Sequence, residues 1–336
     1  MPKSSDRGLL GLVGDVGGTN ARFALAYRRA GRLEIDQPAS FRAADYARGV
    51  DALRAYLDQL KGTVRPAFAV VAAAGPIQDG EVVFTNNTAW RFSEAELDRT
   101  GGFRRARLIN DFTAQALSID HLQGTDLRHV GGPAVRPDLG SAAILGPGTG
   151  FGAGARIDDS EGRAILTSEG GHTGFAPEDN VEVEIVRRLM DRFGRVSVER
   201  LMSGPGLLNL YQTLGAIRGE ATPCAEPDEV TRQALAGEPL SRLALERFCA
   251  ILGSVAGDFA LAYGAVAGVY VSGGIAPAVI EILAASDFRA RFEAKGRMSD
   301  YLKAIPTFVV TQPHAALIGA ASRLASLARD DGAGAS

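Results

Sequence analysis

The sequence predicts an α/β fold of two domains with a cleft between them. A chain of 336 residues is too long for one ordinary core, because domains usually hold about 100 to 200 residues. Apolar runs of strand length alternate with helical patterns along the chain. A strand, a glycine-rich turn and a second strand also occur twice, roughly 130 residues apart, which indicates two related halves. Because glycine-rich hairpins are common, a chance echo is the alternative explanation of this repeat.

Composition and charge exclude several classes of protein. Hydrophobic residues make up 46% of the chain and charged residues 22%, as in globular proteins and unlike disordered ones. The formal net charge is -3 with both signs interspersed, so no basic stripe is available for nucleic acid. The longest apolar run, Pro66 to Ile77, is too short to span a membrane, and the segment MPKSSDRG lacks the apolar core of a signal peptide. We therefore expect a cytoplasmic protein with neither a membrane nor a nucleic acid partner.

The cysteines argue against a zinc site and against a disulfide framework. Cys224 and Cys249 are the two cysteines of the chain. Neither belongs to a CxxC pair or lies beside a cluster of histidines. Both are expected to be reduced thiols.

The first half of the chain is predicted to form a hairpin, a helix, a strand and a strand-to-helix junction. Residues 9–27 contain two apolar runs around the turn GDVGGTN, which predicts a hairpin. Residues 46–60 keep a helical spacing of apolar residues, and PAFAVVAAAGP reads as a buried strand. The strand RARLINDF then runs into the helical pattern TAQALSI, with Asn110 and Asp111 at the junction. The carboxyl ends of strands are where open α/β sheets bind their ligands.

The second half begins with a further strand, glycine-rich turn and strand, in SAAILGPGTGFGAGARI. A helix is predicted over residues 180–193, with an apolar stripe at Val186, Leu189, Met190 and Phe193. The other predicted elements are a helix that starts at Ser203 and Pro205, a long glycine- and alanine-rich helix over 241–264, strands in VAGVYVSGGIAP and IPTFVVTQ, and a helix in HAALIGAASRLASLA.

Three glycine-rich turns, GDVGGTN, GPGTGFG and SGGIAP, each follow a predicted strand. Glycine lets backbone N–H groups approach a polyphosphate closely. Any one of these turns could be purely structural, because glycine is the usual residue where φ is positive. The three together favour a nucleotide-binding protein.

Two other classes of nucleotide-binding protein fit poorly. No glycine is followed by lysine, so the GxxxxGK[ST] phosphate loop is missing, as are the signatures of protein kinases. A dinucleotide fold is the rival, because Gly148, Gly150 and Ala153 nearly satisfy GxGxxG/A. That motif must open a helix, and the following ARIDDSEGRAILTSEGG has no helical stripe.

Two aspartates are candidates for the chemistry. Asp15 precedes Gly17, Gly18, Thr19 and Asn20, so a carboxylate and several donors would meet one phosphate. Mg²⁺ on phosphates takes one or two carboxylates and keeps waters, so we expect Asp15 to act through water; the alternative is an aspartate that caps the turn.

Asp111 is the candidate general base, because it follows a strand and lies beside the carboxamide of Asn110. Its alternative role is the N-cap of the helix that follows. Both roles can coexist.

The loop SEGGHTGFAP places Glu169 and His172 three residues apart around two glycines, where both side chains can bind sugar hydroxyls. A purely structural histidine is the alternative. Glu199, taken alone, reads as a solvated helix charge. Lys295 and Arg297 read either as surface charges or as part of a binding or closure element.

Seven motifs, in their order along the chain, resemble those of the bacterial ATP-dependent glucokinases. They cover about residues 10 to 323. The motifs are LVGDVGGTNARFAL, LINDFTAQA, GPGTGFG, EGGHTGFAP, ERLMSGPGLLNLY, YVSGGIAP and FEAKGRMSDYL.

The resemblance implies a fold, a reaction and a site. The fold is two ribonuclease H-like α/β domains of the actin-like ATPase and hexokinase superfamily around a deep cleft. Residues 1–121 with 312–336 would form the small domain and 122–311 the large one. ATP, ADP, Mg²⁺ and D-glucose are the implied ligands, glucose 6-phosphate is the product, and a homodimer is the implied assembly. Zinc is not expected, since the cysteine cluster of a related branch is missing, and polyphosphate is the alternative donor.

The resemblance also assigns residues to each ligand. Asp111 matches the catalytic base, and Glu199 matches a further hexose ligand. The sugar residues are Asn110, Asp111, Glu169, His172 and Glu199, and the phosphate residues are Asp15, Gly17, Gly18, Thr19, Asn20, Gly148, Thr149, Gly150, Gly273 and Gly274. A kinase for another hexose and a catalytically silent sugar sensor are the alternatives, although the segment before the first strand is too short for a helix-turn-helix.

Overall fold

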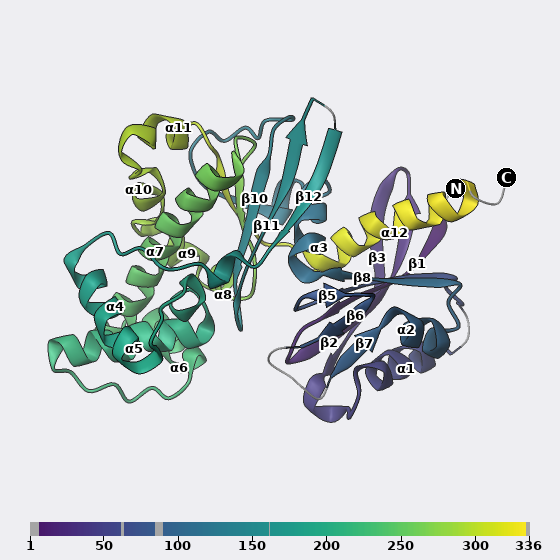
Figure 1. Cartoon of the computed structure of the whole chain (residues 1–336), viewed down its shortest axis with the longest axis horizontal. Helices are drawn as coiled ribbons and strands as arrows, with labels where there is room; N and C mark the ends of the chain where they lie inside the picture. Colours follow the sequence, from purple (N-terminus) through teal and green to yellow (C-terminus); the bar gives the residue numbers. More distant parts are fainter. Residues whose placement is uncertain (1–6, 62–63, 85–89, 161, 334–336) are drawn as a thin grey trace. The chain divides into compact units, whose positions relative to one another are not determined.

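The computed structural model describes residues 7–61, 64–84, 90–160 and 162–333. The chain forms two compact units. One contains the residues up to Gln123 and those from Gln312 onward, and the other runs from Gly124 to Thr311. The C-terminal helix, yellow in Figure 1, therefore belongs with the beginning of the chain.

The first unit is built on a five-stranded sheet. Its elements are β1 (Arg7–Val16), β2 (Asn20–Arg29), β3 (Arg32–Arg42), η1 (Ala43–Asp45), α1 (Gly49–Gln59), β4 (Phe68–Ala73), β5 (Ile77–Gln78), β6 (Glu81–Val83), β7 (Arg91–Ser93), α2 (Glu94–Gly101), β8 (Arg105–Asn110), α3 (Asp111–Ser118) and α12 (Ala315–Ala333). The strand order is β3-β2-β1-β4-β8, and β5, β6 and β7 form a separate small sheet. β1, β2 and β3 pair antiparallel, whereas β4 and β8 run parallel to β1. The predicted hairpin, buried strand and strand-to-helix junction are confirmed.

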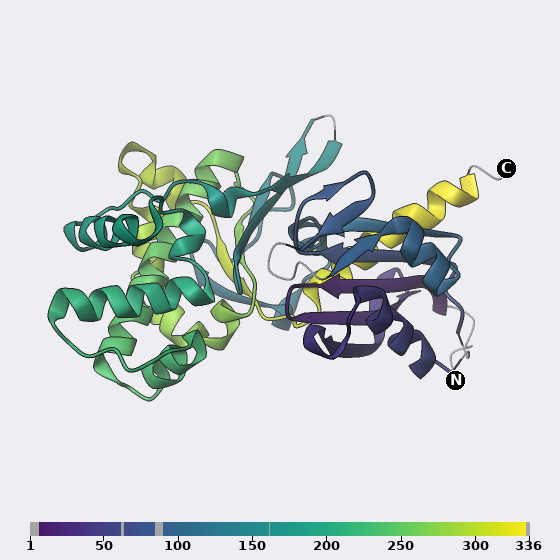
Figure 2. The same cartoon turned by 60° about the horizontal axis from the view of Figure 1, so that its bottom comes forward.

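The two faces of this sheet carry different helices. Along β1, Leu12 belongs to the core that α1 and α2 complete, and the next residue, Val13, packs toward α12. Figures 1 and 2 both show α12 running beside the sheet. Helix α12 also approaches α3 closely, because a Cβ on Gly319 would lie only 1.7 Å from the carbonyl oxygen of Ala114. The helix that begins at Asp111 is thereby held against the sheet.

The free edge of β8 is occupied by two carboxylates of α2. The Ala106 amide donates to Asp98 Oδ1 at 2.5 Å, and the Leu108 amide donates to Glu94 Oε1 at 3.0 Å. An edge strand with exposed N–H groups can pair with another chain, and these carboxylates satisfy two of them. The strand that ends at Asn110 is therefore held from both sides.

The second unit repeats the same topology. Its elements are η2 (Gly124–Asp126), β9 (Leu127–Gly131), β10 (Ala142–Pro147), β11 (Phe151–Asp159), β12 (Gly162–Ser168), η3 (Gly170–His172), α4 (Asn180–Phe193), η4 (Val198–Arg200), α5 (Gly204–Arg218), α6 (Pro227–Leu235), α7 (Pro239–Tyr263), β13 (Val269–Val271), α8 (Ile275–Ala278), α9 (Ile280–Ala285), α10 (Phe288–Glu293), η5 (Gly296–Met298), α11 (Ser299–Lys303) and β14 (Thr307–Val310). The sheet order is β12-β11-β10-β13-β14-β9. Its first five strands match β3-β2-β1-β4-β8 in order and in direction. The predicted internal repeat is confirmed.

Helix α7 forms the centre of the second core, and its glycines allow close packing. A Cβ on Gly253 would lie 2.0 Å from the carbonyl oxygen of Phe288, and one on Gly257 would lie 2.6 Å from that of Phe292. The backbone of α10 therefore rests directly on α7, as Figure 1 also shows. The small side chains of this glycine- and alanine-rich helix thus allow α10 to approach closely.

The predicted apolar stripe of α4 is partly wrong. Leu189 is buried, as predicted, but Met190 is 51% exposed. The buried face is centred instead on Ile185, with the carboxylate-bearing Glu182 one turn before it. The cationic partners of Glu182, Arg247 and Arg291, lie on other helices, so the spacing within α4 did not reveal that it is buried. Within the described part of the chain, none of the helices has both the length and the apolar character needed to cross a bilayer.

Candidate active site

In the first unit, the predicted phosphate turn and the predicted base lie at the same edge of the sheet. Asp15 of β1 is level with Ala72 of β4, and Ala73 of β4 is level with Asn110 of β8. Because these strands are parallel, their carboxyl ends meet at one edge. The sequence therefore brings the GDVGGTN turn and the Asn110–Asp111 junction together with a single strand between them.

The first glycine turn is closed by backbone hydrogen bonds, and its first glycine is open. The amide of Gly17 donates to the carbonyl oxygen of Asn20 at 2.9 Å, and Thr19 accepts from Ala43 at 2.8 Å. A Cβ on Gly17 would meet only the Asn20 carbonyl oxygen, at an ordinary 3.9 Å. The fold has room for a side chain here, so a glycine suits the close approach of a ligand.

Asp15 is paired across the hairpin. Its Oδ2 lies 3.4 Å from Nη1 of Arg22, and its side chain is 23% exposed. Burial raises the pKa of Asp15, while Arg22 and His314 oppose that shift. In the described residues no group of three or more His, Cys, Asp and Glu side chains forms a metal cage. One carboxylate beside an open glycine turn fits a Mg²⁺ that is held mainly by phosphates and waters.

The structure separates the roles of Asn110 and Asp111. The Asn110 Oδ1 atom accepts from the amides of Phe112 and Thr113 at 2.9 and 3.2 Å, so Asn110 is the N-cap of α3. The alternative in which Asp111 caps the helix is wrong, because the extended backbone of a cap occurs at Asn110 and α3 already begins at Asp111. Asp111 Oδ1 accepts from the amide of Phe112 at 3.0 Å. Its carboxylate lies in the first turn, where the helix dipole favours negative charge.

The second glycine turn connects β10 to β11 and contacts the beginning of α5. The Gly148 amide donates to the carbonyl oxygen of Gly150, and Gly148 accepts from the amide of Gly204, both at 2.8 Å. A Cβ on Gly148 would meet nothing within 4 Å, and Thr149 is exposed at the tip. This turn has the same property as the first, a defined backbone with open space at a glycine.

The third glycine turn lies beside the second. Because β13 pairs in parallel with β10, both strands end at one edge of the sheet. Gly273 has a φ of +83°, and a Cβ there would lie 2.4 Å from the carbonyl oxygen of Pro147. Glycine is therefore required by the fold at this position. A Cβ on the neighbouring Gly274, in contrast, would meet no atom within 4 Å.

The predicted sugar residues of the second unit lie in or beside two short helices, η3 and η4, whose flanking segments are hydrogen-bonded to each other. Glu169 precedes η3, His172 ends it, and Glu199 lies in η4. The residues that follow η3 pair with those at the beginning of η4. The amide of Val198 donates to the Thr173 carbonyl oxygen at 3.0 Å. A second hydrogen bond, from Phe175 to Val196, is 3.2 Å long, and an isolated β-bridge joins Gly174 to Ser197.

The carboxylates of Glu169 and Glu199 each lie near one ring nitrogen of His172. His172 Nε2 lies 3.9 Å from Glu169 Oε2, and His172 Nδ1 lies 4.0 Å from Glu199 Oε1. The side chains of Glu169 and His172 are 59% and 62% exposed. Such exposure does not suit a purely structural histidine, and it leaves both carboxylates accessible to a hydroxylated ligand.

Glu199 also contacts the second glycine turn. Its Oε2 accepts from the amide of Phe151, the first residue of β11, at 2.8 Å. A Cβ on Gly150 would lie 2.6 Å from the same oxygen. The reading of Glu199 as a solvated helix charge is wrong, because its side chain is only 34% exposed and its carboxylate lies between His172 and the second glycine turn.

Two further contacts were missed by sequence reasoning. The guanidinium of Arg195 donates to the carbonyl oxygen of His172 at 2.8 Å, and the hydroxyl of Tyr263 donates to Ser168 Oγ at 2.9 Å. Both hold the loop that carries Glu169 and His172, two of the predicted sugar residues. Neither has a local signal in the sequence, since each joins positions that are distant along the chain.

The family model and the similar proteins found for this chain agree on one family. The family model described as Glucokinase matches residues 12–327. A glucokinase of Caulobacter sp. (strain K31) is 53% identical over 312 residues, which cover 93% of this chain and 94% of that protein. A glucokinase of Caulobacter vibrioides (strain NA1000 / CB15N) is 49% identical over 319 residues, covering 94% and 96%.

A solved structure agrees with these relatives. The crystal structure of a glucokinase from an Antarctic psychrotroph has a TM-score of 0.83 to this chain and is 36% identical to it. The match covers 94% of this chain and 98% of that one. The resemblance inferred from the seven motifs is thereby confirmed, and the chain belongs to the glucokinase family.

Proposed function

We propose that this protein transfers the γ-phosphoryl group of ATP to the 6-hydroxyl of D-glucose, giving ADP and glucose 6-phosphate in the first step of glycolysis. Membership of the glucokinase family supports the reaction. The observation that carries it is Glu199, whose carboxylate contacts both the imidazole of His172 and the backbone of Phe151. A group that binds sugar hydroxyls is thus held against a turn suited to phosphates.

Asp111 is the proposed general base. It accepts the proton of the 6-hydroxyl as the hydroxyl oxygen bonds to the γ-phosphorus, and the bond from that phosphorus to the bridging oxygen of ADP breaks. Asn110 positions the sugar beside the base. Its Oδ1 caps α3, and its Nδ2 group donates one hydrogen to the Gly75 carbonyl oxygen at 3.4 Å and has a second hydrogen for the sugar. The exposed carboxylate of Glu169, the partly buried carboxylate of Glu199 and the ring of His172 bind the remaining hydroxyls.

The glycine turns are the proposed ATP-binding elements. The turns formed by Gly17, Gly18, Thr19 and Asn20 in one unit, and by Gly148, Thr149 and Gly150 in the other, would hold the phosphates, and the amides of Gly17 and Gly148 close these turns internally. Gly273 and Gly274 would lie on the adenosine side. Mg²⁺ would be held by the phosphates and, through water, by Asp15, and it would supply positive charge for the phosphoryl oxygens. The open space at Gly17, Gly148 and Gly274 supports this arrangement.

The proposed architecture is a pair of ribonuclease H-like domains around a deep cleft. The matching strand order and direction of the two sheets supports it. The small domain would contain residues 1–121 and 312–336, and the large domain 122–311. Closure on the sugar would exclude water, which is the competing acceptor of the phosphoryl group. The proposal also includes a homodimer in the cytoplasm, where ATP is available.

The test is a coupled assay of ATP-dependent phosphorylation with Mg²⁺. Glucose, mannose, fructose and N-acetylglucosamine are compared, and a reaction without sugar measures ATP hydrolysis. The proposal predicts a strong preference for glucose and little hydrolysis without sugar. A preference for another hexose would assign the site to that sugar, and sugar binding without turnover would make the protein a sensor.

A further inference from the structure

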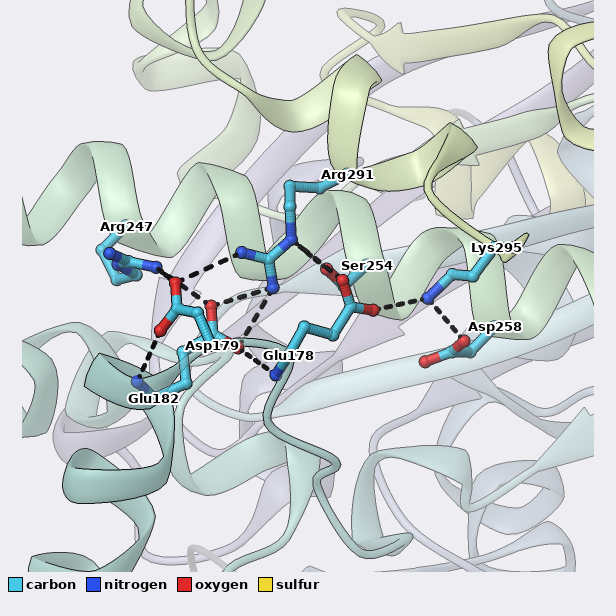
Figure 3. Close-up of polar contacts among 8 residues, drawn as sticks. All are labelled: Glu178, Asp179, Glu182, Arg247, Ser254, Asp258, Arg291 and Lys295. Carbon is cyan, nitrogen blue, oxygen red and sulfur yellow. Dashed lines mark hydrogen bonds and ion pairs between the residues drawn. The ribbon is translucent and has the colours of Figure 1, made fainter. Parts of the chain in front are cut away.

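A cluster of charged side chains holds the segment that follows the sugar residues. It joins the beginning of α4 to α7 and to the region of α10 (Figure 3). We call it the charge cluster, and its members are Glu178, Asp179, Glu182, Arg247, Ser254, Asp258, Arg291 and Lys295. All of these residues belong to the second unit.

The buried member of the charge cluster is Glu182, whose side chain is fully inaccessible to solvent. Nη2 of Arg291 contacts both carboxylate oxygens, at 2.9 and 3.1 Å, and Nη1 of Arg247 contacts one at 3.2 Å. Its Oε2 also accepts from the backbone amide of Glu178 at 2.9 Å. A buried carboxylate needs such pairing because an unpaired one is strongly destabilising.

Glu178 is held by its side chain as well as by its backbone. Its Oε2 lies 3.0 Å from Nε of Arg291, and its Oε1 lies 2.8 Å from Nζ of Lys295. The same Nζ contacts Asp258 Oδ1 at 2.7 Å, and Arg291 Nε donates to Ser254 Oγ at 2.9 Å. Through these contacts Glu178 is tied to α7.

Lys295 is therefore neither an ordinary surface charge nor a residue open to a ligand. Its side chain is 9% exposed. Its stem crosses α7 at Gly257, where a Cβ would lie 2.8 Å from the lysine Cε atom. The reading of Lys295 as a surface charge is therefore wrong.

The other end of the same segment is also held by α7. The hydroxyl of Tyr263 contacts Ser168, directly before Glu169, and a Cβ on Gly170 would lie 2.6 Å from the ring of Phe259. Helix α7 thus holds the segment directly at Ser168, just before Glu169, and holds it through Lys295 at Glu178. The loop between carries Glu169 and His172.

We propose that Lys295 and Arg291 are positioning residues for sugar recognition, acting through Glu178 on the loop that carries Glu169 and His172. The inference rests on the proposed function. A loop held at both ends loses less conformational entropy when it binds a ligand, so releasing one end should weaken sugar binding. Four carboxylates face three cations in the charge cluster. Removing Lys295 deprives two of those carboxylates, Glu178 and Asp258, of a shared cation.

The test compares Lys295→Met with Lys303→Met. Lys303 is the matched control, because it is 57% exposed and pairs with the solvent-facing Asp300. We expect Lys295→Met to raise the KM for glucose about fivefold and to leave the KM for ATP within about twofold. Lys303→Met should change neither constant. Faster hydrogen exchange at the amides of residues 170–176 should accompany the first variant.

A second variant keeps the proposal falsifiable if Lys295→Met folds poorly. Glu178→Gln removes the charge at the end of the loop and leaves the Arg291–Glu182 pair in place. It should raise the KM for glucose to a similar extent, and the double variant should add little to either single change. A lowered Tm with unchanged KM for glucose in both variants would overturn the proposal and leave the charge cluster a purely stabilising role.

Hydrogen exchange separates this inference from the proposed reaction, because it is measured without sugar. If the unaltered protein phosphorylates no sugar while Lys295→Met still accelerates exchange in the loop, the proposed reaction fails and the holding of the loop stands. If the unaltered protein is active on glucose and exchange in the loop is unchanged in the variant, the positioning role fails alone.

Discussion

The carboxylate of Glu199 accepts a hydrogen bond from the backbone amide of Phe151 at 2.8 Å. Its other oxygen lies 4.0 Å from the imidazole of His172. One side chain thus contacts the strand that leaves the second glycine turn and the loop that carries the candidate sugar residues. The proposed reaction needs these two places to keep a fixed separation, because phosphoryl transfer is governed by positioning.

Replacing Glu199 should separate its two roles. Glu199→Gln keeps an oxygen for the Phe151 amide but loses the charge, so we expect a roughly tenfold higher KM for glucose with normal stability. Glu199→Ala leaves the Phe151 amide unpaired and should also cost about 1 to 3 kcal/mol of the free energy of unfolding. Steady-state kinetics and urea unfolding measure the two effects. Glu281→Gln is the control, since that side chain is 82% exposed.

A pair of alanine substitutions in the second glycine turn should act on different ligands. In Gly150→Ala the new Cβ would lie 2.6 Å from Glu199 Oε2, which should displace that carboxylate and raise the KM for glucose. In Gly148→Ala the Cβ meets no protein atom within 4 Å. The second variant should therefore fold normally and raise mainly the KM for ATP. Equal kinetic effects of both variants on ATP alone would argue against the role of Glu199.

Glu169→Gln should weaken the binding of sugar and spare the binding of nucleotide. The side chain is 59% exposed beside His172, and a carboxamide replaces one acceptor oxygen with a donor. We expect lower glucose affinity, with little change in the affinity for ATP measured without sugar. Calorimetric titration with each ligand provides both values. Unchanged glucose affinity would remove Glu169 from the site.

Asp158 should contribute stability that disappears in acid. A hydrogen bond from Arg163 lowers the pKa of this carboxyl, and the nearby Arg156 lowers it further, against an opposing effect of burial. A lowered folded-state pKa gives stability that is present above the unfolded value of about 4 and is lost as the pH falls through the folded value. Asp158→Asn should therefore lower the free energy of unfolding at pH 7.

The same variant should lose its deficit as the pH falls through the lowered pKa of Asp158 in the folded protein, because the native carboxyl is then also protonated. Urea unfolding between pH 2 and pH 7 is the measurement. Asp191→Asn, at a position 72% exposed, is the control. A deficit that stays constant across this range would show that the charge of Asp158 is not its cause.

Local sequence signals predicted those parts of the fold that depend on neighbouring residues. The hairpins around GDVGGTN and GPGTGFG combine apolar runs with glycine turns, so their strands could be placed from the sequence. The N-cap of α3 was harder to assign, because Asn110 and Asp111 are both good capping residues and only the backbone decides between them. The surface position of Met190 depended on which face of α4 meets the core.

The candidate site was predictable where function sets a local motif and not where it depends on tertiary contacts. The EGGH loop has two polar side chains around two glycines, which suggested a ligand. Glu199 has an ordinary sequence context, and its importance comes from a contact with Phe151, 48 positions earlier. The contact of Lys295 with Glu178 spans 117 positions. Neither pairing leaves a periodicity or spacing that a single sequence could show.

The most direct test of the central claim is Asp111→Asn, measured for turnover and for glucose binding in the same preparation. The carboxamide keeps hydrogen-bonding groups but cannot accept the proton of the 6-hydroxyl. We predict that the rate of ATP-dependent glucose phosphorylation falls by about a hundredfold to ten-thousandfold, while calorimetry shows glucose affinity within a few-fold of the unaltered protein. Near-normal turnover in this variant would contradict the assignment of Asp111 as the base.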